Sequence, residues 1–110
     1  MKINSKKKGS RGELEWANFC KKFGFDVRRT QQYCGKSGEA ADCIGLKHIH
    51  QEVKRVENLN VQKAFEQASN DKKTDEIAIV AHRKNNKKWL VTMAASDWIK
   101  FYKDFLKNNG

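Results

Sequence analysis

The sequence contains no proline, no long apolar run and few acidic residues for its many basic ones. No segment approaches the roughly 18 consecutive apolar residues of a membrane-spanning helix, so we expect no membrane partner. No apolar segment follows the basic residues at the N-terminus, which argues against a signal peptide and predicts a cytoplasmic protein. There is no internal repeat and no low-complexity domain. A chain of 110 residues with 38% hydrophobic residues is expected to form one domain with a modest core.

Cysteine is also scarce. The three cysteines, Cys20, Cys34 and Cys43, are an odd number and include no closely spaced pair. Without an export signal, such residues are typical of reduced thiols rather than of a disulfide framework. Cys34 and Cys43, followed by His48 and His50, raise zinc as an alternative. Their spacing is not that of a zinc finger, and Cys43 is expected to face the core. We therefore favour free thiols.

Basic residues, in contrast, are abundant. The chain has 23 Lys and Arg against 13 Asp and Glu, for a formal net charge of +10. This excess favours a polyanionic partner, of which nucleic acid is the commonest, although charge can also serve solubility alone. A membrane-surface role requires a basic amphipathic helix, whereas these residues are spread over the whole chain. No helix is rich in Arg, Asn and Gln at base-reading spacing, so we expect recognition of phosphates and shape.

Apolar periodicity predicts a mixed α/β domain in the order helix, three strands, helix, two strands, helix. Residues 1–9 are expected to form a flexible basic arm. Ser10 and Glu13 are spaced as a capping box for the first helix, while Asn60 and Ser96 are predicted to cap the second and third. The strands are expected at residues 25–30, 40–46, 50–56, 76–83 and 88–93.

The third predicted strand carries an acid and an amine on one face. In an extended chain Glu52 and Lys54 point the same way, while Val53 points into the opposite layer. The carboxylate can hold a divalent cation, and the amine can orient or help deprotonate a water. Asp42 lies in the preceding apolar-flanked strand, so two adjacent strands could bring Asp42 and Glu52 to one ion. The alternative for Glu52 and Lys54 alone is a surface ion pair on a half-exposed strand.

This order of elements, with these residues, resembles the PD-(D/E)xK nuclease fold, and in particular the archaeal-type Holliday junction resolvases and their phage-encoded relatives. Lys8-Gly9-Ser10-Arg11-Gly12-Glu13 looks like the Lys-Gly-x-x-x-Glu signature of that family. Gly24-Phe25-Asp26-Val27-Arg28-Arg29 looks like its Gly-Phe-x-Val-x-Arg strand. Gln51-Glu52-Val53-Lys54 looks like its catalytic strand, and the likeness covers roughly residues 8–93.

The chain departs from the family pattern in two places. Ala41 rather than Pro precedes Asp42, but the Pro is not a ligand, so the ligand set is unaffected. A long polar insert over residues 31–39 could alter how the substrate is gripped.

The resemblance implies a restriction-endonuclease-like domain over residues 10–110, with a central mixed five-stranded sheet flanked by helices. Carried over by position, it makes Glu13, Asp42, Glu52 and Lys54 catalytic. It implies Mg²⁺, with Mn²⁺ as a substitute, held by Asp42, Glu52, the Val53 carbonyl and Glu13. DNA contacts are expected from Lys6, Lys7, Lys8, Arg11, Arg28, Arg29, Lys36, Arg55 and Gln67.

The implied activity is Mg²⁺-dependent cleavage of branched DNA, with resolution of four-way junctions by paired symmetric nicks in a bacterial, archaeal or phage-infected cell. The alternatives are another nuclease of the same fold (a nickase, a flap nuclease or a restriction-like phage enzyme) and a non-catalytic DNA-binding module. The approximate two-fold symmetry of a four-way junction calls for a homodimer. The apolar stripe of Trp98, Tyr102 and Phe105 could serve that interface or the core, and we favour the core.

Overall fold

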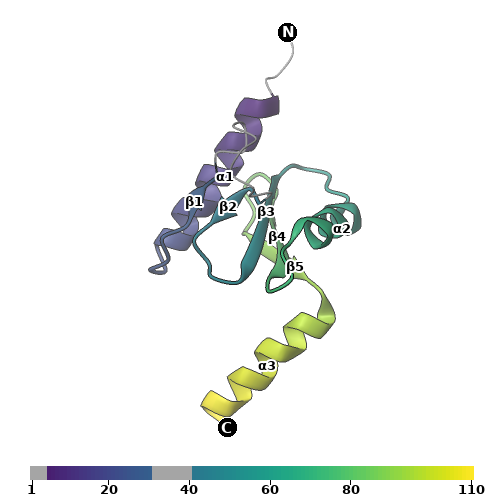
Figure 1. Cartoon of the computed structure of the whole chain (residues 1–110). Coiled ribbons are helices and arrows are strands. Elements are labelled where there is room, and N and C mark those ends of the chain that lie inside the picture. Colours follow the sequence, from purple (N-terminus) through teal and green to yellow (C-terminus); the bar gives the residue numbers. More distant parts are fainter. Residues whose placement is uncertain (1–4, 31–40) are drawn as a thin grey trace.

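The computed structural model describes residues 5–30 and 41–110, which fold into a mixed α/β domain (Figure 1). Over these ranges no helix has the length and apolar character needed to cross a membrane. The elements are α1 (Ser5–Lys21), β1 (Arg28–Arg29), β2 (Cys43–Ile44), β3 (Ile49–Arg55), α2 (Val61–Asp71), β4 (Ile77–Arg83), β5 (Leu90–Met93) and α3 (Ala95–Asn109). Their order confirms the predicted succession of helices and strands.

The described strands form one mixed sheet in the order β1-β2-β3-β4-β5. β3 and β4 run parallel in a long register, and α2 makes the crossover between them. The other neighbouring pairs are antiparallel. β1 and β2 are shorter than predicted. The ladder of β2 stops at Asp42, whose side chain, instead of a backbone carbonyl, accepts the Val53 N–H, and Gly45 turns the chain at its other end.

The two faces of the sheet are covered by different helices, α1 on one and α2 on the other (Figure 1). The α1 side holds the larger core, in which Trp16 packs with Val27, Cys43, Val53 and Ile79. On the α2 side the buried residues are small, with Ala64 and Ala68 of the helix against Ala78 and Val80 of β4. Small side chains let a helix approach the sheet closely, so α2 lies directly over β3 and β4.

The first helix begins earlier than the sequence indicated. α1 starts at Ser5, so residues 5–9, predicted to belong to a flexible arm, are helical. Lysine is a good helix former, and the Lys-rich segment extends the amphipathic helix that follows it. Ser10 therefore lies inside the helix and does not cap it.

The caps of the other two helices differ in outcome. Asn60 caps α2 as predicted, because its Oδ1 accepts the backbone N–H of Lys63 at 3.0 Å. α3 instead begins at Ala95 after Ala94, which supplies no side-chain cap, so the predicted cap Ser96 lies in the first turn.

The last helix leaves the body of the domain after β5 and points away from the sheet (Figure 1). No residue of α3, a helix described over its whole length, is buried. Trp98, Tyr102 and Phe105 are 52%, 44% and 58% exposed, so the prediction that they belong to the core is wrong. The radius of gyration, 14.6 Å, exceeds the value of about 13 Å expected for a compact chain of this length. The α3 stripe is thus a surface feature.

Two glycines with positive φ provide a matched test of how closely the chain packs after β2. Gly45 has φ +119°, and a Cβ added there would lie 2.7 Å from the Cα of Val27, whereas Gly24 has φ +94° and nothing within 4 Å. We expect G24A to lower the free energy of unfolding by about 1–2 kcal/mol through backbone strain alone. G45A should lower it by at least about 3 kcal/mol, because overpacking is added to strain. Urea denaturation of both variants measures the difference, and equal losses would contradict the close approach at Gly45.

Candidate active site

The side chains of β3 alternate between the two covered faces of the sheet. Gln51 points to α1, where its Oε1 accepts the indole N–H of Trp16 at 2.8 Å. His50, Glu52 and Lys54 share the other face, where Glu52 lies 3.7 Å from Lys54 and 3.6 Å from His50. This is the α2 side, since the charge of Asp71 in α2 acts on His50. Glu52 and Lys54 therefore share a face, as the strand alternation predicts.

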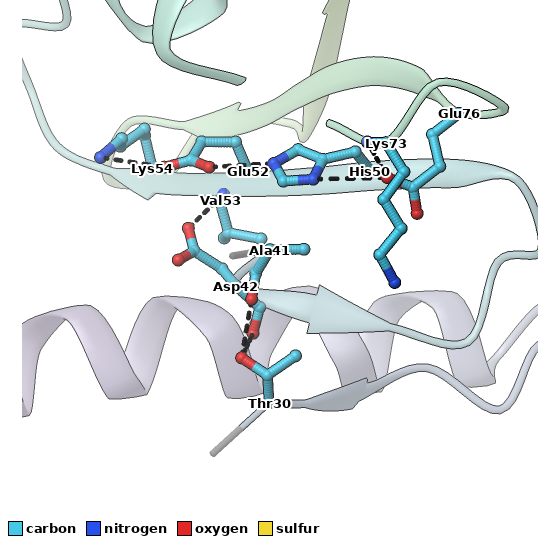
Figure 2. Close-up of polar contacts among 9 residues, drawn as sticks. All are labelled: Thr30, Ala41, Asp42, His50, Glu52, Val53, Lys54, Lys73 and Glu76. Atoms are coloured by element: carbon cyan, nitrogen blue, oxygen red, sulfur yellow. Dashed lines mark hydrogen bonds and ion pairs between the residues drawn. The ribbon is translucent and has the colours of Figure 1, made fainter. Parts of the chain in front are cut away.

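On the α2 side these side chains form a buried row of alternating acidic and basic groups (Figure 2). The side chains of His50 and Glu52 are 1% and 4% exposed, and Nδ1 of His50 lies 3.8 Å from Oε1 of Glu76. Burial alone would lower the pKa of His50, but the carboxylates of Glu52, Glu76 and Asp71 together raise it above its usual value. The row ends at Lys54, whose side chain is 33% exposed. Lys54 is therefore the most exposed member of the row.

Asp42 approaches the same part of β3 from the neighbouring strand. Its Oδ2 accepts the backbone N–H of Val53 at 2.8 Å (Figure 2), and its own N–H donates to the carbonyl of Gln51 at 2.9 Å. Cys43 pairs with Gln51, so Asp42, which directly precedes Cys43, lies beside the Gln51–Val53 stretch of β3. In a strand the N–H and C=O of one residue point to the same side, so the Val53 carbonyl also faces the strand of Asp42. Two carboxylates and one carbonyl thus occupy neighbouring positions on adjacent strands.

Glu13 has a different partner from the one the family pattern suggests. Its Oε1 accepts a hydrogen bond from Nε of Arg29 at 3.1 Å, which links α1 to β1. Within residues 5–30 and 41–110, no three or more His, Cys, Asp or Glu side chains are arranged to hold a metal. Of the four predicted ligands, Asp42 and Val53 are joined by a hydrogen bond, Glu52 is the residue before Val53, and Glu13 pairs with Arg29.

The residues predicted to contact DNA lie in several environments. Nε of Arg55 donates to Glu15 at 3.0 Å, which ties β3 to α1 and leaves the Arg55 side chain only 19% exposed. Arg28 is exposed and pairs with Asp26 at 3.3 Å. Arg11 and Gln67 are exposed on α1 and α2, whereas Lys36 and the side chains of Lys6, Lys7 and Lys8 lie outside the described part of the chain.

A cleft that the sequence did not reveal opens where β3 and β4 end. It has a volume of about 770 Å³ and lies between the β3–α2 connection and the β4–β5 turn. His82 lines it, and His82 is the register partner of Lys54. Four basic residues line this basic cleft: Arg83, Lys84, Lys87 and Lys88. Ligands of open α/β sheets commonly bind at the carboxyl ends of parallel strands, which is where this cleft lies.

The sequence holds a signal for the basic cleft and for the place of His50 in the buried row, although neither is predicted from it. Arg83-Lys84 and Lys87-Lys88 flank the Asn85-Asn86 turn. Because turns are expected to be polar and solvated, these charges do not by themselves predict a binding cleft. His50 shares the face of Glu52, but in the sequence it stands out only as a candidate zinc ligand that follows Cys34 and Cys43. The carboxylate on the other side of its ring comes from Glu76, which no local spacing connects to β3.

His82 gives the site a measurable pH dependence. Its Nε2 lies 2.9 Å from Oγ1 of Thr92, and burial lowers the pKa of His82 from its usual 6.5. The folded protein then binds this proton less readily than the unfolded chain, so stability from neutral His82 is complete above that pH and declines as the pH falls below it. We expect the free energy of unfolding of the wild type, minus that of H82Q, to decrease between pH 7.5 and pH 5.5. His50 is common to both proteins and cancels in this difference, and a difference independent of pH would contradict the assignment.

Comparison with known proteins gives no family assignment, since the chain matches no protein-family model, no curated protein and no solved structure. The fold and the site by themselves define an α/β domain in which Asp42 is hydrogen-bonded to the β3 backbone next to Glu52 and Lys54, with a basic cleft at the end of the same strand.

Proposed function

We propose that the protein is a Mg²⁺-dependent, structure-specific DNA endonuclease of the PD-(D/E)xK type, which resolves four-way junctions by paired symmetric nicks. The observation that carries this proposal is the hydrogen bond from the Val53 N–H to the Asp42 carboxylate at 2.8 Å, which brings Asp42 to the stretch of β3 that carries Glu52 and Lys54. On that stretch Nζ of Lys54 lies 3.7 Å from the Glu52 carboxylate. The mixed sheet with a crossover helix between its parallel strands supports a restriction-endonuclease-like fold. The basic cleft at the same end of the strands supports a polyanionic substrate.

The donor set fits a hard divalent cation. Carboxylate oxygens from Asp42 and Glu52 and the Val53 carbonyl are the ligands that Mg²⁺ prefers, and Mn²⁺ accepts the same set. Oε1 of Glu52 is buried without a hydrogen-bond donor in the described structure, and its neighbour is the His50 ring at 3.6 Å. A buried acceptor in this state is destabilising unless a cation or donor satisfies it. When bound, Mg²⁺ would acidify the attacking water and offset charge on the scissile phosphate.

The protein's own groups then hold the phosphate and the water. The N–H of Val53 fixes the Asp42 carboxylate, so this ligand is oriented before substrate arrives. The Lys54 ammonium offsets negative charge that develops on the phosphate and orients the attacking water. While protonated it cannot act as a base. Glu13 holds the guanidinium of Arg29, so Glu13 is a positioning residue, and Arg29 is the group that contacts a DNA phosphate.

The basic cleft is the part of the surface suited to the flanking phosphates. Lys84, Lys87 and Lys88 are exposed and line the cleft together with His82, the register partner of Lys54. Lysine ammonium groups bind phosphates as point charges and carry no base-reading geometry. Recognition through such groups is by position and shape of the backbone, as expected for a branched substrate.

A second candidate is a DNA-binding module without catalysis. It is favoured by one observation, the burial of Glu52 between His50 and Lys54, which gives this carboxylate compensating charges without any metal. The basic cleft serves this function equally well.

Cleavage of four-way, flap and linear duplex DNA, each with and without Mg²⁺, tests the proposal. Symmetric nicks confined to the junction, with 5′-phosphate and 3′-hydroxyl ends, are the expected result. Preferential flap or duplex cutting would instead identify another nuclease of the same type. Binding of all three substrates without any cutting would leave only the non-catalytic module.

A further inference from the structure

One side of α3 carries a continuous apolar stripe whose side chains are about half exposed. Trp98, Ile99, Tyr102, Phe105 and Leu106 are each between 43% and 58% exposed. At 100° per residue they cover an arc of about 120° on the helix surface. The rings of Trp98 and Tyr102 stack at 5.5 Å, and those of Tyr102 and Phe105 at 6.3 Å. A contiguous patch of this kind marks an interaction surface.

We propose that α3 pairs in antiparallel orientation with α3 of a second copy of this chain, about a two-fold axis at Tyr102. A two-fold interface requires a patch that is complementary to itself. A two-fold axis at Tyr102 reverses the helix direction but keeps each flank of the stripe against the same flank of the partner's stripe. Trp98 then lies against the partner's Phe105, and Ile99 lies against the partner's Leu106. Aromatic residues thus meet aromatic residues on one flank, and aliphatic residues meet aliphatic residues on the other. The two copies of Tyr102 meet at the centre.

Four of the five charged residues of α3 lie well outside this seam, and the fifth, Lys103, lies about 100° from its centre. Asp97, Lys100, Asp104 and Lys107 lie roughly 140–160° from the centre of the stripe at 100° per residue. They stay in solvent on the outer side of each helix when the stripes pair, so the pairing buries none of these charges. Lys100 already pairs with Asp97 of its own helix at 3.3 Å.

The exposed apolar area of the stripe is more than half of what one partner buries in a standard interface. A buried aromatic side chain removes roughly 150–250 Å² from water, and the side chains of the stripe are about half exposed. Together they offer about 500 Å² of the roughly 800 Å² per partner found in standard interfaces. Phe101, 46% exposed at the edge of the stripe, and the flanking polar atoms extend this area. A second copy is therefore an occupant of matching size.

The pairing supplies the second active site that paired nicks require, but its test does not depend on cleavage. Light scattering after size-exclusion chromatography should give twice the chain mass of 12.7 kDa. F105E should give a monomer with an unchanged circular dichroism spectrum, because α3 contributes no buried residue in the described structure. The matched control is F23E, which changes an equally large apolar side chain, 66% exposed just after the end of α1, and should remain a dimer.

Disulfide cross-linking tests the orientation and the register. In a Cys34→Ser background, Y102C should form a covalent dimer, because the two copies of this position meet on the axis. W98C alone should not, since its two copies lie about 12 Å apart along the helices at 1.5 Å per residue. A mixture of W98C and F105C should cross-link as a heterodimer.

Several results would overturn the pairing. A wild type that stays at 12.7 kDa at high concentration excludes it. So does a dimer that persists in F105E, or a dimer in which Y102C fails to cross-link. A monomer whose F105E variant loses binding to anionic phospholipid vesicles would assign the stripe to a membrane surface instead.

Discussion

Asp42→Asn is expected to reduce Mg²⁺-dependent cleavage of a four-way junction by about 1,000-fold or more, with junction binding nearly unchanged. The asparagine still accepts the Val53 N–H, so the local backbone is preserved. It lacks the negative charge with which the carboxylate would hold the cation. Single-turnover cleavage and electrophoretic binding assays on the same protein measure the two effects separately. Glu52→Gln should behave alike, with an added loss of stability because His50 loses its closest carboxylate.

The chain contains a matched control for these substitutions. Asp71-Lys72-Lys73 is a second acid-x-Lys triplet, in which Asp71 is exposed at the end of α2. D71N should cleave at the wild-type rate. If D42N and E52Q also cleave at that rate, the two carboxylates do not hold the catalytic metal.

Removal of the charge of the basic cleft is expected to weaken junction binding by about 100-fold at low salt. In the triple variant K84Q/K87Q/K88Q three phosphate contacts are lost, and each contributes a slope of about −0.9 to log K against log salt. The slope should therefore become less steep by about 2.7. Titration of labelled junction DNA at several salt concentrations measures both quantities.

The control for that variant removes the same charge elsewhere. K21Q/K22Q/K47Q changes three exposed lysines in α1, after it and in the β2–β3 connection. A contribution from net charge alone would weaken binding equally in both triple variants, which would contradict a DNA-binding role for the cleft. The expected result is a much smaller effect in the control.

The long buried elements could be predicted from the sequence, because their patterns are set by burial. β3 and β4 lie within a residue or two of the predicted ranges, and the Asn60 cap of α2 is local chemistry. The shared face of Glu52 and Lys54 follows from the alternation of a strand. These features need no knowledge of what packs on them.

The misplaced features depend on contacts between distant residues. β2 is short because the Asp42 side chain takes the Val53 N–H that a longer strand would bond, and no pattern in residues 40–46 shows this. The family resemblance predicts Glu13 as a metal ligand, and no pattern in the sequence shows that Arg29 contacts it across the α1–β1 boundary. The stripe of α3 has core periodicity, but the sequence does not say whether the core belongs to one chain or two.

The most direct measurement of the proposed metal site is a crystal structure determined with Mn²⁺, using the anomalous signal of the ion. The expected result is one anomalous peak between the carboxylates of Asp42 and Glu52, at coordination distance from the Val53 carbonyl and lost in crystals of D42N. A structure with these carboxylates ordered and no peak between them, while the same protein cleaves junctions in Mn²⁺, would contradict it.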